Sequence, residues 1–211
     1  MNVAVRNREL EAYTEGLAAS GHPELSVEVA DRALVPQGEG FLQYVIAYLQ
    51  QSGTRIRSGE TLRYGYWMTK FLGDDRLLRV WEHNREATDF VPGANLALTY
   101  WREQHRICGH FGGSFTPPRP DQLVVISEGV FEGDPVEGVR YPSPAHMSGW
   151  WITTDRYNGR PESLRTEHCY HLTAARPDLA GYLALPYGFR FNIAVAEGAW
   201  YDTAVAKEPA Q

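Results

Sequence analysis

The sequence predicts an α+β fold, with one or more mainly antiparallel sheets and three to four helices packed on one side. Residues 38–52 place apolar side chains at helical spacing. In residues 62–71 and 189–195, apolar and polar side chains instead alternate, as they do in a half-buried strand. The composition, with 43% hydrophobic and 22% charged residues, is that of an ordinary globular chain with enough apolar side chains for a core.

The first elements are predicted to be two helices separated by a short strand. Residues 6–20 have apolar side chains at helical spacing, and a strand is expected over 25–29. The clearest helix of the chain covers 38–52, and Gly53 stands where a C-terminal cap belongs. The apolar stripe of this helix consists of Phe41, Tyr44, Val45, Tyr48 and Leu49.

A hairpin and a third helix are expected next. Residues 62–71 and 77–82 form the predicted hairpin around a Gly-Asp-Asp turn. The helix is expected over 94–107, with Gly109 as its terminator, and a buried strand over 123–126. A glycine- and proline-rich loop separates the last two elements. The chain is therefore expected to be one continuous domain or two abutting halves, 1–120 and 121–205, with a tail over 206–211.

The segment from Arg140 to Asp155 is predicted to contain the central strand of the second half. Two prolines keep its approach extended, and Trp150 and Trp151 open an aromatic, β-branched run. Because side chains alternate along a strand, the two tryptophans are expected on opposite faces, one in a core and one toward a second layer or a partner. The remaining predicted elements are strands over 164–172 and 189–195 and a short helix between Pro177 and Pro186.

The net charge of −6 disfavours binding to nucleic acid or to an anionic membrane, because both attract cationic surfaces. It favours a partner with a basic surface. The sequence has no apolar run of about 18 residues and no apolar centre of a signal peptide near its start, so a cytoplasmic protein without a membrane span is expected. The two cysteines are expected to be free thiols.

Two groups of histidine and cysteine suggest an alternative function, a small metal-binding or thiol enzyme. Imidazole and thiolate are ligands that zinc prefers, and a thiolate beside a histidine can act as a nucleophile. However, adjacent residues on a strand point to opposite faces, and buried cysteines and aromatic-flanked histidines are common in ordinary cores. We therefore expect no cofactor. The candidate ligands are His105, Cys108 and His110 in one group and His168, Cys169 and His171 in the other.

An acidic, glycine-rich segment precedes the Trp-Trp strand and contains no lysine or arginine between residues 128 and 137. Such a segment is either a solvated connection or an electronegative docking surface for a basic protein. Aromatic side chains beside an acidic rim are typical of protein-binding sites. The candidate partner-binding residues are Glu128, Glu132, Asp134, Glu137, Trp151 and Tyr157.

Part of the second half resembles a known family. The residues that carry the resemblance are Gly149-Trp150-Trp151-Ile152-Thr153, Tyr157-Asn158-Gly159, Arg176-Pro177-Asp178-Leu179 and Leu185-Pro186-Tyr187-Gly188-Phe189-Arg190-Phe191. This pattern is similar to immunity proteins of bacterial polymorphic-toxin systems, in the group related to the thirty-third predicted immunity-protein family. The resemblance implies a non-enzymatic protein that binds a cognate toxin or effector and blocks it. A regulatory module that binds a small ligand in an aromatic pocket is a further alternative.

Overall fold

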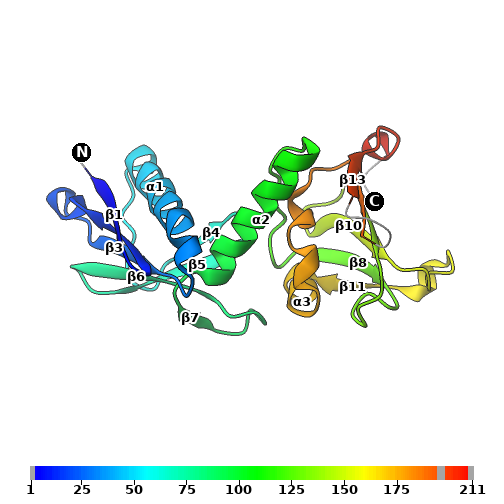
Figure 1. The fold of residues 1–211 in the computed structure, drawn as a ribbon, viewed down its shortest axis with the longest axis horizontal. Helices are drawn as coiled ribbons and strands as arrows, with labels where there is room; N and C mark the ends of the chain where they lie inside the picture. Colours follow the sequence, from blue (N-terminus) through cyan, green and yellow to red (C-terminus); the bar gives the residue numbers. More distant parts are fainter. Residues whose placement is uncertain (1–2, 194–197, 209–211) are drawn as a thin grey trace. The chain divides into compact units, whose positions relative to one another are not determined.

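The protein divides into two compact units, Met1–Arg102 and Glu103–Gln211, which are described separately. The computed structural model describes residues 3–193 and 198–208 (Figure 1). Each unit contains a mixed sheet and helical segments, which confirms the predicted α+β class. The division falls inside helix α2 (Asn95–Phe111), whereas the sequence suggests a boundary near residue 120.

The sheet of the first unit consists of β1 (Ala4–Arg8), β2 (Glu11–Glu15), β3 (Glu24–Glu28), β4 (Thr61–Tyr64), β5 (Trp67–Gly73), β6 (Leu77–His83) and β7 (Phe90–Pro92). The strand order is β1-β2-β3-β6-β5-β4, and β7 pairs with β6. Only the β3–β6 pairing of this sheet is parallel among the described residues. The predicted strand over 25–29 corresponds to β3, and β5 and β6 form the predicted hairpin.

Helix α1 (Val35–Ser52) packs on β1, β2 and β3 and confirms the clearest helix of the sequence. Phe41, Val45 and Leu49 of the predicted stripe are buried. Tyr44 and Tyr48 lie at the edge of the stripe and remain 46% and 39% exposed. Leu42 and Ile46 are buried instead, so the buried face of the helix is shifted toward them relative to the predicted stripe.

Two glycines fit α1 to its surroundings. A Cβ atom at Gly38 would lie 3.2 Å from Cγ1 of Val27 and 3.5 Å from Cβ of Ala12, so glycine allows close approach to the sheet. Gly53 has a φ of +64°, and its amide donates to the Leu49 carbonyl at 3.0 Å. The predicted C-terminal cap is confirmed.

The helix predicted over 6–20 is wrong, because most of this segment forms the β1–β2 hairpin. Glu9 and Leu10 make its two-residue turn, and Glu9 adopts a φ of +43°. Pairing of β2 with β3 buries Ala12 and Thr14, whereas Leu10 remains 44% exposed. The few apolar residues of this short segment fit the spacing of a helix as well as that of a strand, and pairing with β3 selects the strand.

The single strand predicted over 62–71 is also wrong, since it consists of β4 and β5. The chain turns between them at Gly65, which has a φ of +59°, and at Tyr66, which is fully buried. Because the turn interrupts the alternation, the aromatic residues before and after it do not continue one face of one strand.

The first turn of helix α2 donates hydrogen bonds to a buried carboxylate. Glu82 of β6 is 2% exposed and accepts hydrogen bonds from the amides of Leu96 at 2.9 Å and Ala97 at 2.7 Å. Burial raises the pKa of Glu82 to about 7, against the effect of these backbone donors. The helix continues two residues past Gly109, which the sequence suggests as its terminator.

The sheet of the second unit consists of β8 (Leu123–Ser127), β9 (Glu137–Arg140), β10 (Met147–Thr153), β11 (Leu164–His168), β12 (Phe189–Asn192) and β13 (Gly198–Tyr201). The strand order is β11-β8-β10-β9-β12-β13, with β8 and β10 parallel. The predicted buried strand over 123–126 and the Trp-Trp strand are confirmed as β8 and β10.

Two predictions for the second unit need correction or completion. The strand predicted over 164–172 ends at His168, and helix α3 (Cys169–Ala175) follows it directly. The predicted short helix after Pro177 is two 3₁₀ helices, Pro177–Leu179 and Tyr182–Ala184. The last predicted strand corresponds to β12, and its residues Ala194 and Val195 lie outside the described residues.

One face of this second sheet is covered by α3 and by the segment that follows it, both orange in Figure 1. The ring of Phe191 lies 5.2 Å from that of Trp150 and 4.8 Å from that of Tyr182, measured between centroids. The Trp150 indole donates to the Leu183 carbonyl at 3.0 Å. Trp150 and Phe191 are fully buried, so this face is the core of the unit.

Candidate functional site

A buried cation organises the second unit. Arg140 of β9 is 2% exposed, and its guanidinium lies over the rings of Trp150 and Tyr187, 5.8 Å and 4.8 Å from their centroids. Burial lowers the pKa of Arg140 to about 10. The guanidinium donates hydrogen bonds of 2.5–3.2 Å to the carbonyl oxygens of Thr116, Ser148, Leu183 and Leu185. Arg140 therefore joins β9 to β10 and to two loops, and its role is structural.

The two adjacent tryptophans point to opposite faces of β10, as the sequence predicts. Trp150 is fully buried beside Arg140, whereas Trp151 is half-buried on the other face. The rings of Trp151 and Tyr141 meet edge to face, with centroids 6.1 Å apart. Trp151 therefore presents part of an indole to solvent on the face opposite the core.

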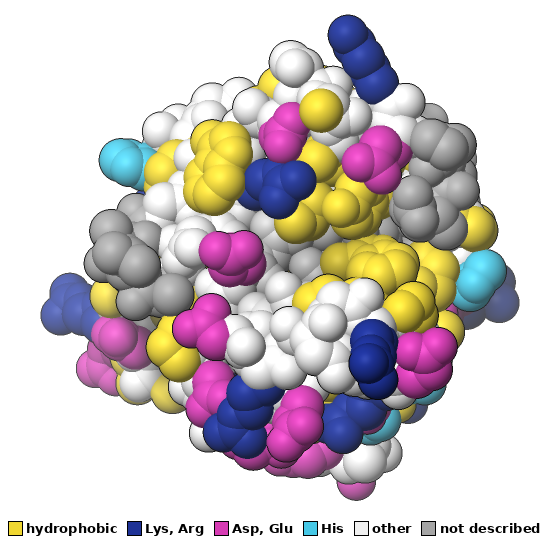
Figure 2. All heavy atoms as spheres, turned by 90° about the vertical axis from the view of Figure 1, so that its right-hand side faces the viewer, with side chains coloured by type: hydrophobic (Ala, Val, Ile, Leu, Met, Phe, Trp, Pro, Cys, Tyr) yellow, Lys and Arg dark blue, Asp and Glu magenta, His cyan; other side chains and the backbone are white. Residues whose placement is uncertain are grey.

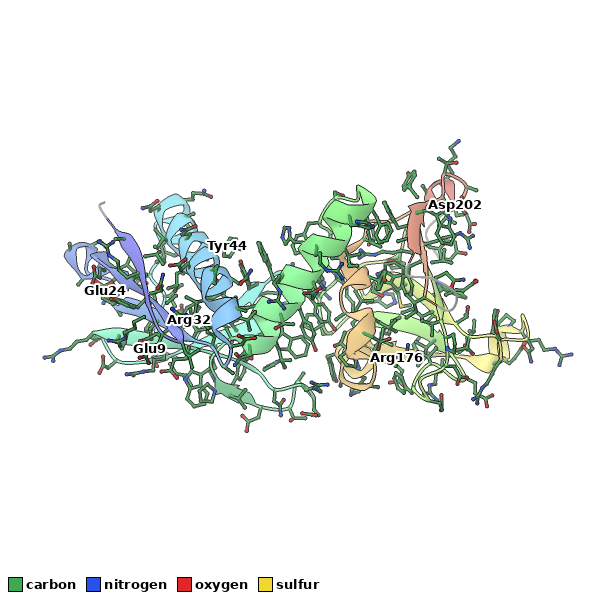
Figure 3. The ribbon with its side chains drawn as sticks, in the orientation of Figure 1. Glu9, Glu24, Arg32, Tyr44, Arg176 and Asp202 are labelled. Carbon is green, nitrogen blue, oxygen red and sulfur yellow. The ribbon has the colours of Figure 1, made fainter. Side chains whose placement is uncertain are left out.

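The acidic segment 128–137 lies at the end of the sheet where β8 ends and β9 begins. Arg156, which follows β10, contacts two of its carboxylates: Asp134 at 2.7 Å and Glu128 at 3.6 Å. Arg176, labelled in Figure 3, donates to the carbonyl oxygens of Val130 and Asp134, both at 3.0 Å. Arginines distant in the sequence therefore hold this segment and neutralise part of its charge.

The remaining candidate partner-binding residues are more accessible. Glu132 is exposed and has no ion pair or hydrogen bond within the described part of the chain. Glu137 is exposed and accepts a hydrogen bond of 2.7 Å from the Asn192 amide. Tyr157 is half-buried in the turn after β10. The six candidates come from this end of the sheet, from β10 and from the turn that follows it.

The cysteines of the alternative function are buried and have weakly acidic thiols. Cys108 is 3% exposed in α2, and Cys169 is fully buried at the start of α3. Burial raises the pKa of the Cys108 thiol to about 11 and that of Cys169 to about 12. A nucleophilic or metal-binding cysteine needs the opposite shift, because the thiolate is the reactive form.

The histidines of these two groups pack against aromatic rings. His105 stacks on Phe115 with centroids 3.9 Å apart, and burial lowers the pKa of His105. His168 stacks on Tyr170 at 5.1 Å, and His171 lies 3.4 Å from the Glu167 carboxylate. Among residues 3–193 and 198–208, no three His, Cys, Asp or Glu side chains gather in a group that could hold a metal ion.

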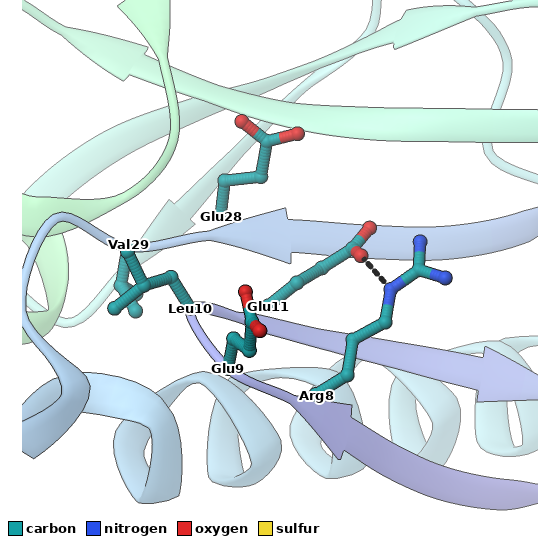
Figure 4. Close-up of a pocket in the computed structure, with 6 residues that line it drawn as sticks. All are labelled: Arg8, Glu9, Leu10, Glu11, Glu28 and Val29. Atoms are coloured by element: carbon teal, nitrogen blue, oxygen red, sulfur yellow. Dashed lines mark hydrogen bonds and ion pairs between the residues drawn. The ribbon is translucent and has the colours of Figure 1, made fainter.

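The first unit has an open pocket of about 410 Å³ beside the β1–β2 turn (Figure 4). Its lining includes Glu9, Glu11 and Glu28, and Glu11 pairs with Arg8 at 2.7 Å. Glu11 and Glu28 occupy opposite positions of β2 and β3, where like charges disfavour pairing. The pocket is a shallow acidic surface without an assembled catalytic group.

The sequence gives no signal for three exposed aromatic side chains in the second unit. Tyr187, Trp200 and Tyr201 are 38%, 48% and 53% exposed. On the side of the molecule shown in Figure 2, hydrophobic side chains gather in one area, and acidic and basic side chains intermix below it. An exposed aromatic in a strand can be recognised only when its sheet neighbours are known, because local alternation does not say which face is covered.

The second unit is an α+β domain whose core includes the buried Arg140 and whose surface carries acidic and aromatic side chains. Its sequence matches an immunity-protein family. Residues 103–202 match the family model described as the Imm33-like domain. The match covers nearly the whole second unit and extends well beyond the residues that carried the resemblance. Neither the curated proteins nor the solved structures contained a match. No helix in the described ranges is long and apolar enough to cross a membrane.

Proposed function

We propose that this chain is an immunity protein that binds a cognate bacterial toxin or effector and neutralises it by protein–protein contact, without chemistry of its own. The match of residues 103–202 to the Imm33-like domain carries the proposal. The weakly acidic thiols of Cys108 and Cys169 disfavour the alternative of a thiol enzyme, because the thiolate is the reactive form.

Co-expression tests this function directly. The chain is produced in bacteria together with the product of the adjacent reading frame, and growth and complex formation are measured. Rescue of growth together with a complex stable to gel filtration is the expected result. A toxic adjacent product that the chain neither binds nor neutralises would refute the proposal.

We also propose that the acidic segment, with Trp151 and Tyr157, contributes to toxin binding. Opposite charges speed association and select the partner, so a basic toxin surface suits this segment. Glu128 and Asp134 share Arg156, which a cationic side chain of the partner would have to displace. Glu132 and Glu137 are therefore the carboxylates best placed to meet the partner.

A charge reversal tests this contribution. Glu132→Lys is expected to slow association with the toxin several-fold, and the effect should shrink at high salt. Glu162→Lys is the matched control, because Glu162 is also exposed in the second unit but lies in a separate 3₁₀ helix, Pro161–Ser163. Equal association rates for the two variants would remove the acidic segment from the interface.

A further inference from the structure

A row of residues crosses five strands of the second sheet on the face opposite the core. Residues directly opposite each other in a sheet point to the same face, so the registers define this row. Val125 of β8 pairs with Trp151 of β10, Trp151 with Val139 of β9, Val139 with Arg190 of β12, and Arg190 with Trp200 of β13. Val125 is buried. We call the other four residues, Trp151, Val139, Arg190 and Trp200, the outer row.

The outer row combines apolar area with a neutralised cation. Trp151, Val139 and Arg190 are half-buried, and Trp200 is 48% exposed. Arg190 forms an ion pair with Asp202 at 2.8 Å, so its charge is balanced within the unit. The row has a tryptophan at each end, and tryptophan is among the residue types that most often dominate the binding energy of protein interfaces.

The row ends on β13, a short edge strand whose four residues include no charged side chain and no proline. Soluble proteins protect edge strands with charged side chains or proline, because an open edge invites pairing with another chain. Among the described strands, the other sheet edges follow this rule: β1 contains Arg6 and Arg8, β4 contains Arg63, and β11 contains Arg165 and Glu167. The sequence of β13 is Gly-Ala-Trp-Tyr, with no charge and no proline. An edge of this kind is expected to be covered by a partner.

The charge of the second unit identifies the kind of partner. Residues 103–211 contain 13 Asp and Glu and nine Lys and Arg. Of the nine cations, Arg140 is buried among carbonyl oxygens, and Arg176 is buried and pairs with Asp178 at 2.8 Å, so an excess of acidic groups remains on the surface. Glu137 begins β9 two residues before Val139, next to the row, and is exposed. A second copy of this chain would bring like charges together, whereas a basic protein would be attracted.

We propose that the outer row and the β13 edge form the central contact with the basic surface of the cognate toxin, and that Glu137 lies at the rim of this contact. The inference rests on the proposed function and names the surface that performs it. Trp151 and Trp200 supply the anchors that become buried in the complex, and the toxin lies along the β13 edge. The acidic segment then acts as a flank that steers association rather than as the centre of the interface.

The test uses the full chain and an inactivated form of the product of the adjacent reading frame. Binding is measured for the wild type and for Trp151→Ala, Trp200→Ala and the control Tyr48→Ala, which removes an aromatic side chain 39% exposed in the first unit. Circular dichroism confirms that each variant is folded. We expect both tryptophan variants to bind at least tenfold more weakly, mainly through faster dissociation, and the control to match the wild type. Hydrogen exchange of the complex should show new protection of the β13 amides.

The outcomes separate this inference from the proposed function. If the wild type does not bind the adjacent product, the proposed function fails, and the inference fails with it. If the wild type binds and both tryptophan variants stay within twofold of it, only the inference is overturned. It is also overturned if the chain alone is a dimer by light scattering at physiological salt and Trp200→Ala converts it to a monomer, because a second copy then occupies this surface.

Discussion

Replacing Glu82 with glutamine is expected to remove a pH dependence from the stability of the first unit. Burial raises the pKa of this carboxyl from 4.5 to about 7. The folded state therefore holds the proton more tightly than the unfolded chain between these two values. The resulting stabilisation is complete below pH 4.5 and is lost as the pH rises through 7.

The size of this effect follows from the shift of the pKa. Each unit corresponds to about 1.4 kcal/mol, so the full effect is about 3 kcal/mol, of which about 2.5 kcal/mol falls between pH 5 and pH 8. Glutamine has the same shape but no charge to lose. Its side-chain amide keeps one acceptor oxygen but places its NH2 group against the backbone amide of either Leu96 or Ala97, which costs about 1–3 kcal/mol at every pH.

The measurement is the free energy of unfolding of the wild type and Glu82→Gln in urea at pH 5, 6, 7 and 8, with hydrogen exchange of the Ala97 amide reporting on the first unit. Burial also lowers the pKa of the neighbouring His83, but both proteins share that effect. The difference between their unfolding free energies therefore reports on Glu82 alone. A difference that stays constant within about 0.5 kcal/mol from pH 5 to pH 8 would show that the carboxylate remains ionised and would refute this reasoning.

Three further results are expected for the second unit. Arg140→Met should lower its free energy of unfolding by about 3–5 kcal/mol, because the carbonyl oxygens of Thr116, Ser148 and Leu185 lose the guanidinium donor, whereas that of Leu183 keeps the Trp150 indole; a loss below about 1 kcal/mol in thermal unfolding would contradict this. Gly138→Ala should cost about 1–3 kcal/mol by urea titration, because its Cβ would overlap the ring of Phe191, and an unchanged midpoint would show that the ring can move freely. The thiols of Cys108 and Cys169 should react with a disulfide reagent at pH 8 only after unfolding; rapid reaction of the native protein would contradict the raised pKa values.

The sequence predicts an element reliably when its pattern is long and fits only one period. The 38–52 helix has an apolar stripe from Phe41 to Leu49, which is more than two turns, and the Trp-Trp strand is β-branched and aromatic; both elements are confirmed. The apolar residues between 6 and 20 are few and fit both a helix and a hairpin. Pairing with β3 selects the hairpin, and no local pattern contains that information.

The same limit applies to the candidate site. The acidic segment looks uncompensated along the chain, yet Arg156 and Arg176 reach it from positions beyond β10 and at the end of α3. Nothing local indicates that Arg140 is buried, because its partners are carbonyl oxygens from three other segments. The orientation of Trp151 follows from alternation alone, whereas its alignment with Trp200 depends on the register of four strands.

The buried arginines connect the core of the second unit to its surface charge. Arg140 binds carbonyl oxygens and has no acidic partner among the described residues, whereas Arg176 binds carbonyl oxygens and also pairs with Asp178 at 2.8 Å. Because Arg140 is buried without an acidic partner, the surface of the second unit is slightly more acidic than its composition suggests. In the proposed complex, this negative charge attracts the basic surface of the toxin and disfavours contact between two copies of the chain at the outer row and the β13 edge. On this proposal, the apolar anchors slow dissociation of the toxin, and the excess of negative charge speeds and selects its association.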